Sequence, residues 1–132
     1  MSFNVNKIVS YWENHAEYDI KTAKHMFDTK RYPYVLFMCH LSIEKLLKGI
    51  YVKENGKHSI YTHNLVELAK KIKIDFSDEQ KKLLAELSGF NIEARYPEWK
   101  SNFYKIATKS FTEKYYTQTK KFYLWLKKYL KK

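Results

Sequence analysis

The stretch PYVLFMCHLSIEKLLKGIYVKE, residues 33–54, decides the fold. Its first half is apolar on nearly every side when wound as a helix, and a helix of that kind lies at the centre of a protein. Pro33 suits the first turn of a helix, and Asn55-Gly56 follows the last turn as a break. The sequence therefore predicts a buried central helix from about Pro33 to Glu54, against which other segments pack.

The segment before it, from about Val5 to Phe27, has the period of a helix with one apolar face. Apolar and aromatic residues recur there mostly at steps of three and four. They are Ile8, Tyr11, Trp12, His15, Tyr18, Ile20, Ala23 and Phe27. Pro33 disfavours helical backbone at Tyr32, so we expect the first helix to end within DTKRYPY, residues 28–34.

Three further helices are predicted after the central one, each opening with a residue that can cap it. In such a cap a side-chain oxygen accepts from the helix backbone, and a Glu or Gln three residues later can return the bond. The expected pairs are Asn64 with Glu67, Ser77 with Gln80, and Ser110 with Glu113. The first of these helices is short, and the last runs to the end of the chain.

The composition also favours helices. The 132 residues include three Gly and two Pro, and 45% of them are hydrophobic. A β-sandwich or barrel needs more turns than so few Gly and Pro provide, and a disordered chain has fewer apolar residues. We expect an all-α antiparallel bundle of four long helices plus one short helix, forming a single domain over residues 1–132.

Cysteine use and hydropathy indicate where the protein works. The single cysteine, Cys39, excludes an intramolecular disulfide and fits a reducing compartment. The opening MSFNVNKIVSYWEN lacks the basic and apolar regions of a signal peptide, and the longest apolar run, YVLFMC, is too short to span a bilayer. We therefore expect a cytoplasmic protein that makes no membrane contact.

Positive charge is concentrated at the end of the chain. The net charge is +11, from 25 Lys and Arg against 14 Asp and Glu. Residues 100–132 hold ten Lys and one acid, Glu113, which is +9, so residues 1–99 contribute +2. Such a field attracts polyanions, nucleic acid above all, although the same lysines also make a solubilising surface. Both interpretations stay open.

Three motifs together resemble the HEPN domain family, whose name abbreviates a nucleotide-binding domain of higher eukaryotes and prokaryotes. They are IEKLLK (Ile43 to Lys48), THNL (Thr62 to Leu65) and ARYPE (Ala94 to Glu98). The first lies within the central helix, the second follows a short loop, and the third ends the fourth helix. The resemblance covers roughly residues 10–130.

The resemblance implies a helical bundle that forms a homodimer. Many HEPN domains act with a minimal nucleotidyltransferase, often as a toxin and antitoxin pair, and many others are metal-independent ribonucleases. The ribonucleases carry an Arg, then four to six intervening residues, then a His, and dimerisation brings two such motifs into one cleft. A nucleotidyltransferase partner and a nucleotide or RNA ligand are therefore implied.

The sequence departs from that ribonuclease motif. Counting from Arg95, the positions for the His hold Lys100, Ser101 and Asn102, and no His follows His63. RNA cleavage without a metal needs proton transfer near neutral pH, which imidazole performs and Asn does not. The resemblance thus assigns a functional role to Arg95 but does not imply ribonuclease activity. The expected function is a binding module, and the alternative is a divergent ribonuclease toxin.

Arg95 is the main candidate binding residue, because a guanidinium recognises phosphate through two parallel hydrogen bonds. Aromatic and polar neighbours offer stacking surfaces and further contacts. The candidate site comprises Arg95, Tyr96, Glu98, Trp99, Lys100, Asn102, Glu44 and Lys48. In the structural alternative, Arg95 pairs with a carboxylate and fixes the turn at Pro97. The carboxylates considered are Glu93, Glu98 and Glu44.

His40, Glu44 and Lys48 stand at i, i+4 and i+8 of the central helix and so share one face. In one interpretation they line a cleft facing Arg95, and His40 supplies the missing imidazole. In the other, Glu44 and Lys48 form an ion pair along the helix, and His40 finds its hydrogen-bond partners at the edge of the core. His58 and His63 lack metal-ligand spacing, so neither a metal nor a cofactor is predicted. We expect His63 to pack the loop and help to cap the short helix.

The last helix interleaves aromatic residues with lysines in YYTQTKKFYLWLKKYL, residues 115–130. This pattern fits an RNA-contacting face, an amphipathic helix on a membrane surface, or a core-facing stripe with solvated lysines behind it. The third interpretation is favoured. Aromatic residues that stay exposed would then form the dimer face.

Overall fold

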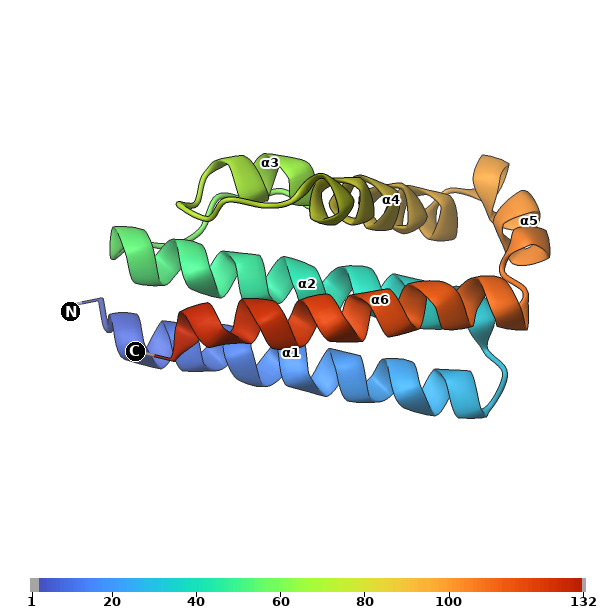
Figure 1. Cartoon of the computed structure of the whole chain (residues 1–132), viewed down its shortest axis with the longest axis horizontal. Coiled ribbons are helices and arrows are strands. Elements are labelled where there is room, and N and C mark those ends of the chain that lie inside the picture. Colours follow the sequence, from blue (N-terminus) through green and yellow to red (C-terminus); the bar gives the residue numbers. More distant parts are fainter. Residues whose placement is uncertain (1–2, 132) are drawn as a thin grey trace.

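The computed structural model describes residues 3–131, which form helices and their connections (Figure 1). The helices are α1 (Val5–Asp28), α2 (Tyr32–Asn55), α3 (Leu65–Lys70), α4 (Asp78–Arg95), α5 (Pro97–Ile106) and α6 (Lys109–Lys127), followed by the 3-10 turn η1 (Lys128–Leu130). No strand occurs within residues 3–131. The predicted all-α class is confirmed, and α1, α2, α4 and α6 are the long helices.

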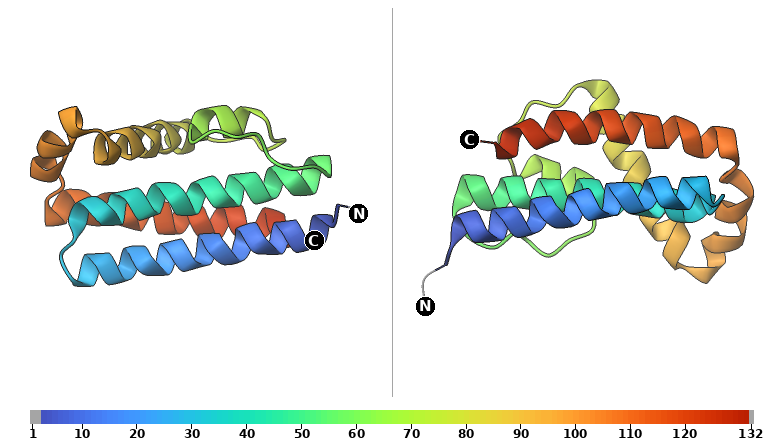
Figure 2. Two further views of the ribbon diagram at one scale, coloured as in Figure 1. Left: turned by 180° about the vertical axis from the view of Figure 1, so that it is seen from behind. Right: turned by 90° about the horizontal axis from the view of Figure 1, so that it is seen from below.

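α1 and α2 form an antiparallel hairpin, and α6 lies along the same pair of helices (Figures 1 and 2). α3 and α4 pack on the other side of α2, where α4 crosses it at an angle (Figure 2). Both chain ends lie at one end of the bundle, and α5 lies at the opposite end, near the turn between α1 and α2 (Figure 1). This arrangement makes α2 the central helix, as predicted.

Burial explains why α2 is central. Fourteen of its 24 residues are buried, and it contacts α1, α3, α4 and α6. Gly49 lets α1 approach closely, since a Cβ added there would lie 3.1 Å from Cβ of Trp12. The buried set of α2 also includes His40, Glu44 and Lys48, polar side chains that need partners inside the protein.

The helix caps correct one prediction. Ser77 forms a full capping box with Gln80, and the Asn64 side chain accepts from the backbone of Glu67, as expected. The predicted cap at Ser110 is wrong, because Thr108 caps α6 by accepting from Phe111 N at 3.3 Å. The helix therefore begins one residue before Ser110, which lies inside its first turn.

α5 is a second short helix that the sequence pattern did not predict. Tyr96 has extended backbone, with φ −99° and ψ 130°, and Pro97 opens α5 directly after it. Phe103 is fully buried and packs against Phe90 of α4, with ring centroids 5.7 Å apart. A proline at the first helical position has its φ preset, so the same residue that ends α4 starts the next helix.

The buried face of α1 differs from the predicted stripe. Ile20 and Ala23 of that stripe are buried as predicted, whereas Tyr11 and Tyr18 are 51% and 73% exposed. The buried residues are Val9, Ala16, Asp19, Ile20 and Ala23. Small residues at this face, such as Ala16 and Ala23, bring the two helix backbones close together, and Tyr11 and Tyr18 stay on the outside.

None of the helices within residues 3–131 combines the length and the apolar character needed to cross a membrane.

Candidate functional site

Glu44 lies at the centre of a buried polar cluster between α2 and the loop before α3. Its two carboxylate oxygens accept separate hydrogen bonds, one from Lys48 Nζ at 3.0 Å and one from His63 Nδ1 at 3.0 Å. Nε2 of His40 lies 3.7 Å from the oxygen that His63 contacts. The Lys48 ammonium also stands 5.4 Å from the ring centre of Trp12. A buried carboxylate needs this kind of satisfaction by charged and polar partners.

His40 is fully buried, and both of its ring nitrogens are engaged. Nε2 lies 2.8 Å from the backbone oxygen of His63, and Nδ1 lies 3.2 Å from the side-chain nitrogen of Asn91. A carbonyl oxygen can only accept, so Nε2 carries the proton and Nδ1 accepts from Asn91. Burial lowers the pKa of His40, and the bond to the His63 carbonyl opposes that shift in part. His40 is thus a neutral imidazole with no nitrogen left for a ligand.

Asn91 connects this buried imidazole to the surface. Its side-chain oxygen accepts from Nη1 of Arg95 at 3.4 Å, one helical turn away on α4. Arg95, Asn91, His40 and the His63 carbonyl therefore form a continuous series of hydrogen bonds, which we call the Arg95 network. It runs from the exposed end of α4 across α2 to the loop before α3.

His63 is the accessible imidazole of the cluster, with its side chain 41% exposed. Because a carboxylate can only accept, the bond to Glu44 places the proton on Nδ1 and leaves a lone pair on Nε2. Within residues 3–131, Nε2 of His63 has no hydrogen-bond partner. The ring edge of Tyr61, itself 91% exposed, lies 5.8 Å away between centroids. An imidazole held in this way can accept a proton from a bound molecule.

The predicted site residues separate into two groups. His40, Glu44 and Lys48 lie together inside the protein on one face of α2, as their spacing predicts. The remaining residues are exposed around the junction of α4 and α5. They are Arg95, Tyr96, Glu98, Trp99, Lys100 and Asn102. The Arg95 network joins the two groups through Asn91, a residue outside the predicted site.

Arg95 forms no ion pair with a carboxylate within the described part of the chain. The structural alternative, a pair with Glu93, Glu98 or Glu44, is therefore not what the structure contains. The guanidinium donates instead to a neutral amide, and no carboxylate of the described residues lies within ion-pair distance of it. Such a group keeps its capacity to bind an external anion.

Apolar side chains are exposed on the last turn of α4, at Tyr96 and along α5. We call this surface the α5 face, and its residues are Ile92, Tyr96, Trp99, Tyr104 and Ile106, each between 38% and 53% exposed. The Tyr104 hydroxyl donates to that of Tyr34 at 3.2 Å, and Lys100 Nζ lies 5.8 Å from the Tyr104 ring centre. Exposed apolar groups gathered in this way mark surfaces that contact a ligand or partner.

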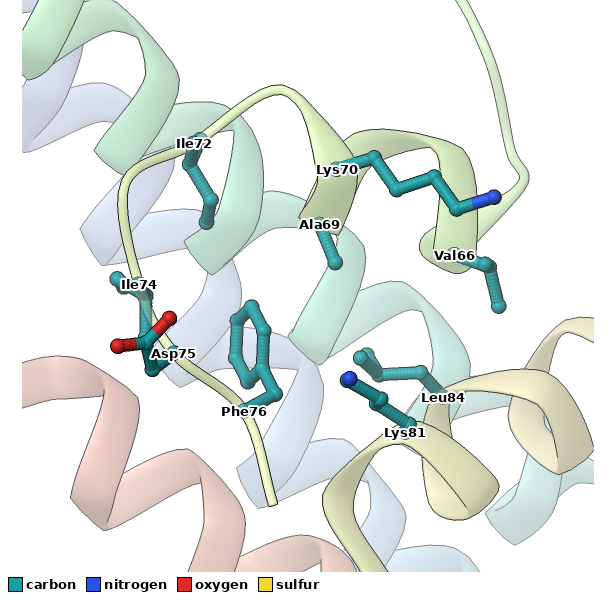
Figure 3. A pocket seen from close by; sticks show the side chains of 9 residues that line it. All are labelled: Val66, Ala69, Lys70, Ile72, Ile74, Asp75, Phe76, Lys81 and Leu84. Atoms are coloured by element: carbon teal, nitrogen blue, oxygen red, sulfur yellow. The ribbon is translucent and has the colours of Figure 1, made fainter. Parts of the chain in front are cut away.

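A pocket of about 380 Å³ lies elsewhere, beneath the connection from α3 to α4 (Figure 3). The Phe76 ring points into it from the connection, and Lys70 and Lys81 stand at its side (Figure 3). The pocket shares no lining residue with the Arg95 network. Over residues 3–131, moreover, no three His, Cys, Asp or Glu side chains are grouped so as to hold a metal ion.

Two residues of the site were not found by sequence reasoning. Asn91 precedes Arg95 by four residues, so their shared helix face was a usable signal. His63 was expected to pack the loop and help to cap α3, whereas Asn64 makes the cap and His63 binds the buried carboxylate. That contact joins residues 19 positions apart, and helix spacing alone does not reveal it.

The fold is an antiparallel hairpin of two helices on which two further long helices pack. The candidate site is a polar cluster on the central helix. These features define an all-α bundle protein. Over residues 9–129 the sequence matches the HEPN domain. Because this match takes in well over half of the sequence, the chain belongs to the HEPN domain family.

The fold is similar to that in the crystal structure of TT1696 from Thermus thermophilus. The TM-score is 0.80 at 16% sequence identity, over 92% of this chain and 97% of that chain. At this identity the likeness shows a shared fold. No curated protein matches this chain in sequence.

Proposed function

We propose that this protein is a cytoplasmic, homodimeric binding module that holds a nucleotide or RNA at Arg95. The observation that carries the proposal is the Arg95 guanidinium, exposed and oriented by Asn91 without a carboxylate partner in residues 3–131. A guanidinium in that state binds phosphate through charge-assisted hydrogen bonds. Tyr96 and Trp99, about half exposed beside it, are suited to stack on bases.

The surroundings of Arg95 support this ligand class. Lys100 and Asn102 are exposed on α5 and add donors near the guanidinium, and Glu98 is available to accept from a base or sugar. The buried residues Glu44 and Lys48 support the site from within, because Glu44 fixes the His63 loop that the Arg95 network reaches.

The α5 face supports the partner proposals. Homodimers bury surfaces rich in aromatic residues, and the α5 face offers such a surface around Arg95. Two copies meeting there would bring two Arg95 side chains to one basic site. We propose that the dimer works alongside a minimal nucleotidyltransferase in a system of the toxin and antitoxin kind, on the ground of its family membership.

Binding of short RNA and of nucleotides to wild type and to Arg95→Ala tests the proposal. At low salt we expect the wild type to bind and Arg95→Ala to bind about tenfold more weakly, because one charge-assisted contact is lost. Lys7→Ala is the control, since Lys7 is an exposed cation in the first turn of α1, at the end of the bundle opposite α5 (Figure 1). Equal binding by all three proteins would overturn the assignment of Arg95.

RNA cleavage is the second candidate function, and the Glu44–His63 pair is the observation that favours it. His40 has both nitrogens engaged, whereas His63 keeps Nε2 for an external donor. In the reaction, the 2′-oxygen attacks phosphorus as its proton passes to His63 Nε2, and the bond to the 5′-oxygen breaks. A water molecule protonates that 5′-oxygen, so charge and atoms balance.

Incubation of purified protein with RNA separates the two functions. Under the second function, His63→Ala and Arg95→Ala both abolish cleavage, while His15→Ala, a change at an exposed histidine on α1, leaves it intact. Intact RNA after incubation with wild type, together with binding that depends on Arg95, supports the binding module alone.

A further inference from the structure

The pocket of about 380 Å³ beneath the connection from α3 to α4 is lined mainly by hydrocarbon (Figure 3). Its apolar lining residues are Ala69, Ile72 and Leu84, which are buried, and Val66, Ile74 and Phe76, which are partly exposed. Apolar side chains at a concave surface in contact with water favour a ligand that removes them from water. The pocket is therefore suited to bind an apolar group.

The connection that covers the pocket is fixed at both of its ends. The backbone N–H of Lys73 donates to both carboxylate oxygens of Glu54 on α2, at 3.0 and 3.1 Å. At the other end, Ser77 exchanges two hydrogen bonds with Gln80 in the capping box of α4. Residues 74–76 lie between these two attachments. The pocket is thus preformed, and a ligand that enters it does not have to order the connection.

The polar groups of the lining are few and all of them are charged. Lys70, Asp75 and Lys81 line the pocket, and none of the nine lining residues has an amide, hydroxyl or imidazole side chain. A peptide or a sugar would lose its hydrogen bonds to water on entry, with no such side chain to replace them. The part of the ligand inside the pocket is therefore expected to be plain hydrocarbon.

The charged groups of the pocket favour an anion at its edge. Two lysines and one carboxylate line it, which leaves a charge of +1. Neither Lys70 nor Lys81 forms an ion pair within residues 3–131. In the view of Figure 3, the Phe76 ring lies between the Asp75 carboxylate and the ammonium of Lys81. The Lys81 ammonium is thus available to a carboxylate from outside the protein.

We propose that this pocket binds a medium-chain fatty acid, with the hydrocarbon chain among the apolar side chains and the carboxylate at Lys81. The lining has one aromatic ring, Phe76, and is otherwise aliphatic, which suits a flexible chain better than a flat ring. Its volume lies near the lower end of the range of small-molecule sites, about 300 to 1,000 Å³, and this favours a chain of medium length. The proposal is independent of the function proposed for Arg95, because the pocket and the Arg95 network share no residue.

Titration with octanoate, followed through the backbone amide signals in NMR, measures both the affinity and the place of binding. Below the micelle concentration we expect saturable shifts centred on residues 66–84, with one molecule bound per chain. Decanoate, two methylene groups longer, is expected to bind about tenfold more tightly, because each buried methylene adds to the transfer free energy. Octanol, which lacks the charge, is expected to bind about tenfold more weakly than octanoate.

Neighbouring lysines provide a matched pair of variants for the headgroup. Lys81 and Lys82 are adjacent on α4, yet only Lys81 is among the residues that line the pocket. Lys81→Gln is expected to weaken octanoate binding about tenfold and to leave octanol binding unchanged, because only the acid contacts the ammonium. Lys82→Gln removes the same charge from the protein and is expected to leave the binding of both compounds unchanged.

Two alanines provide a matched pair of variants for the hydrocarbon chain. The Ala69 side chain points from α3 into the pocket (Figure 3), so Ala69→Leu fills space that the chain would occupy. This change is expected to abolish the binding of octanoate and octanol alike. Ala85→Leu makes the same change at an exposed position of α4 outside the pocket and is expected to have no effect. Circular dichroism and thermal unfolding verify that each variant is folded.

Several outcomes would overturn the proposal. An equal loss of octanoate binding in Lys81→Gln and Lys82→Gln would show a general attraction of anions to a basic protein. Undiminished binding in folded Ala69→Leu, or shifts centred on the α5 face, would place the acid elsewhere. Absence of saturable shifts in the wild type with both octanoate and decanoate would reject the pocket as a fatty-acid site.

Discussion

Nδ1 of His63 donates a 3.0 Å hydrogen bond to a carboxylate oxygen of Glu44, so a buried group on α2 holds an imidazole on a surface loop. The other carboxylate oxygen holds Lys48. Glu44 thereby combines two tasks: it neutralises a buried ammonium and orients the accessible imidazole. A residue with both tasks cannot be replaced without a loss of stability.

Glu44→Gln is expected to lower the free energy of unfolding by about 3 kcal/mol, because it leaves the buried Lys48 ammonium without a counter-charge. Urea unfolding followed by circular dichroism measures the change. Glu17→Gln is the control, since Glu17 pairs with Lys21 at 3.5 Å on the surface, and it is expected to alter stability little. A similar small loss in both variants would mean that the buried pair contributes no more than the surface pair.

The buried His40 predicts an acid-sensitive fold. Burial lowers its pKa below the ordinary 6.5, so the unfolded chain takes up the proton first as the pH falls. Stability supplied by the neutral imidazole is present above about pH 6.5 and is lost as the pH drops toward the folded-state pKa. Between about pH 7.5 and 5.5, the free energy of unfolding of the His40→Gln variant is expected to fall less than that of the wild type. Parallel pH profiles for the two proteins would contradict this.

Gly49 and Gly89 predict opposite responses to the same change. At Gly49 a Cβ would meet Cβ of Trp12 at 3.1 Å, and that atom cannot rotate away, so Gly49→Ala is expected to separate α1 from α2 and lower the melting temperature. At Gly89 the nearest atom is a flexible Glu93 oxygen at 3.9 Å. Gly89→Ala is therefore expected to stabilise the protein by up to about 1 kcal/mol through helix propensity. Thermal unfolding of the two variants gives the sign of each effect.

The start of α6 gives a local test of the fold. Thr108 caps the helix, so Thr108→Ala is expected to cost about 1 kcal/mol of unfolding free energy. Ser110 lies inside the first turn and is exposed, and Ser110→Ala is expected to be neutral or slightly stabilising, because alanine favours helix. If urea unfolding showed a larger loss of unfolding free energy in Ser110→Ala than in Thr108→Ala, Ser110 would be the cap, as the sequence pattern predicts.

Features set by local chemistry could be predicted from the sequence. The apolar character of residues 33–54 identified the central helix, and the spacing of Ser77 and Gln80 identified a cap that the structure contains. Rules based on neighbours in the sequence failed where contacts with residues distant in the sequence determine burial or helix formation. Ala16 faces α2 in place of Tyr11 because the helices approach closely, and α5 forms because buried Phe103 anchors a segment that resembles a turn.

The candidate site shows the same division. Helix spacing placed His40, Glu44 and Lys48 on one face, and they lie together. The link from Arg95 to His40 runs through Asn91 across two helices, and Asn91 and His40 are 51 positions apart in the chain. Which side chains meet at that separation depends on how α2 and α4 cross, and one sequence carries no local signal of that crossing.

We expect the Arg95 network to link the surface arginine thermodynamically to the loop before α3. The hydrogen bonds that orient Arg95 end on the backbone carbonyl of His63, so displacement of either end weakens the restraint on the other. Linkage of this kind is reciprocal. A ligand that pulls the guanidinium away from Asn91 lowers the free energy needed to open the loop, and a molecule that clamps the loop raises the affinity for a ligand that leaves Arg95 in place.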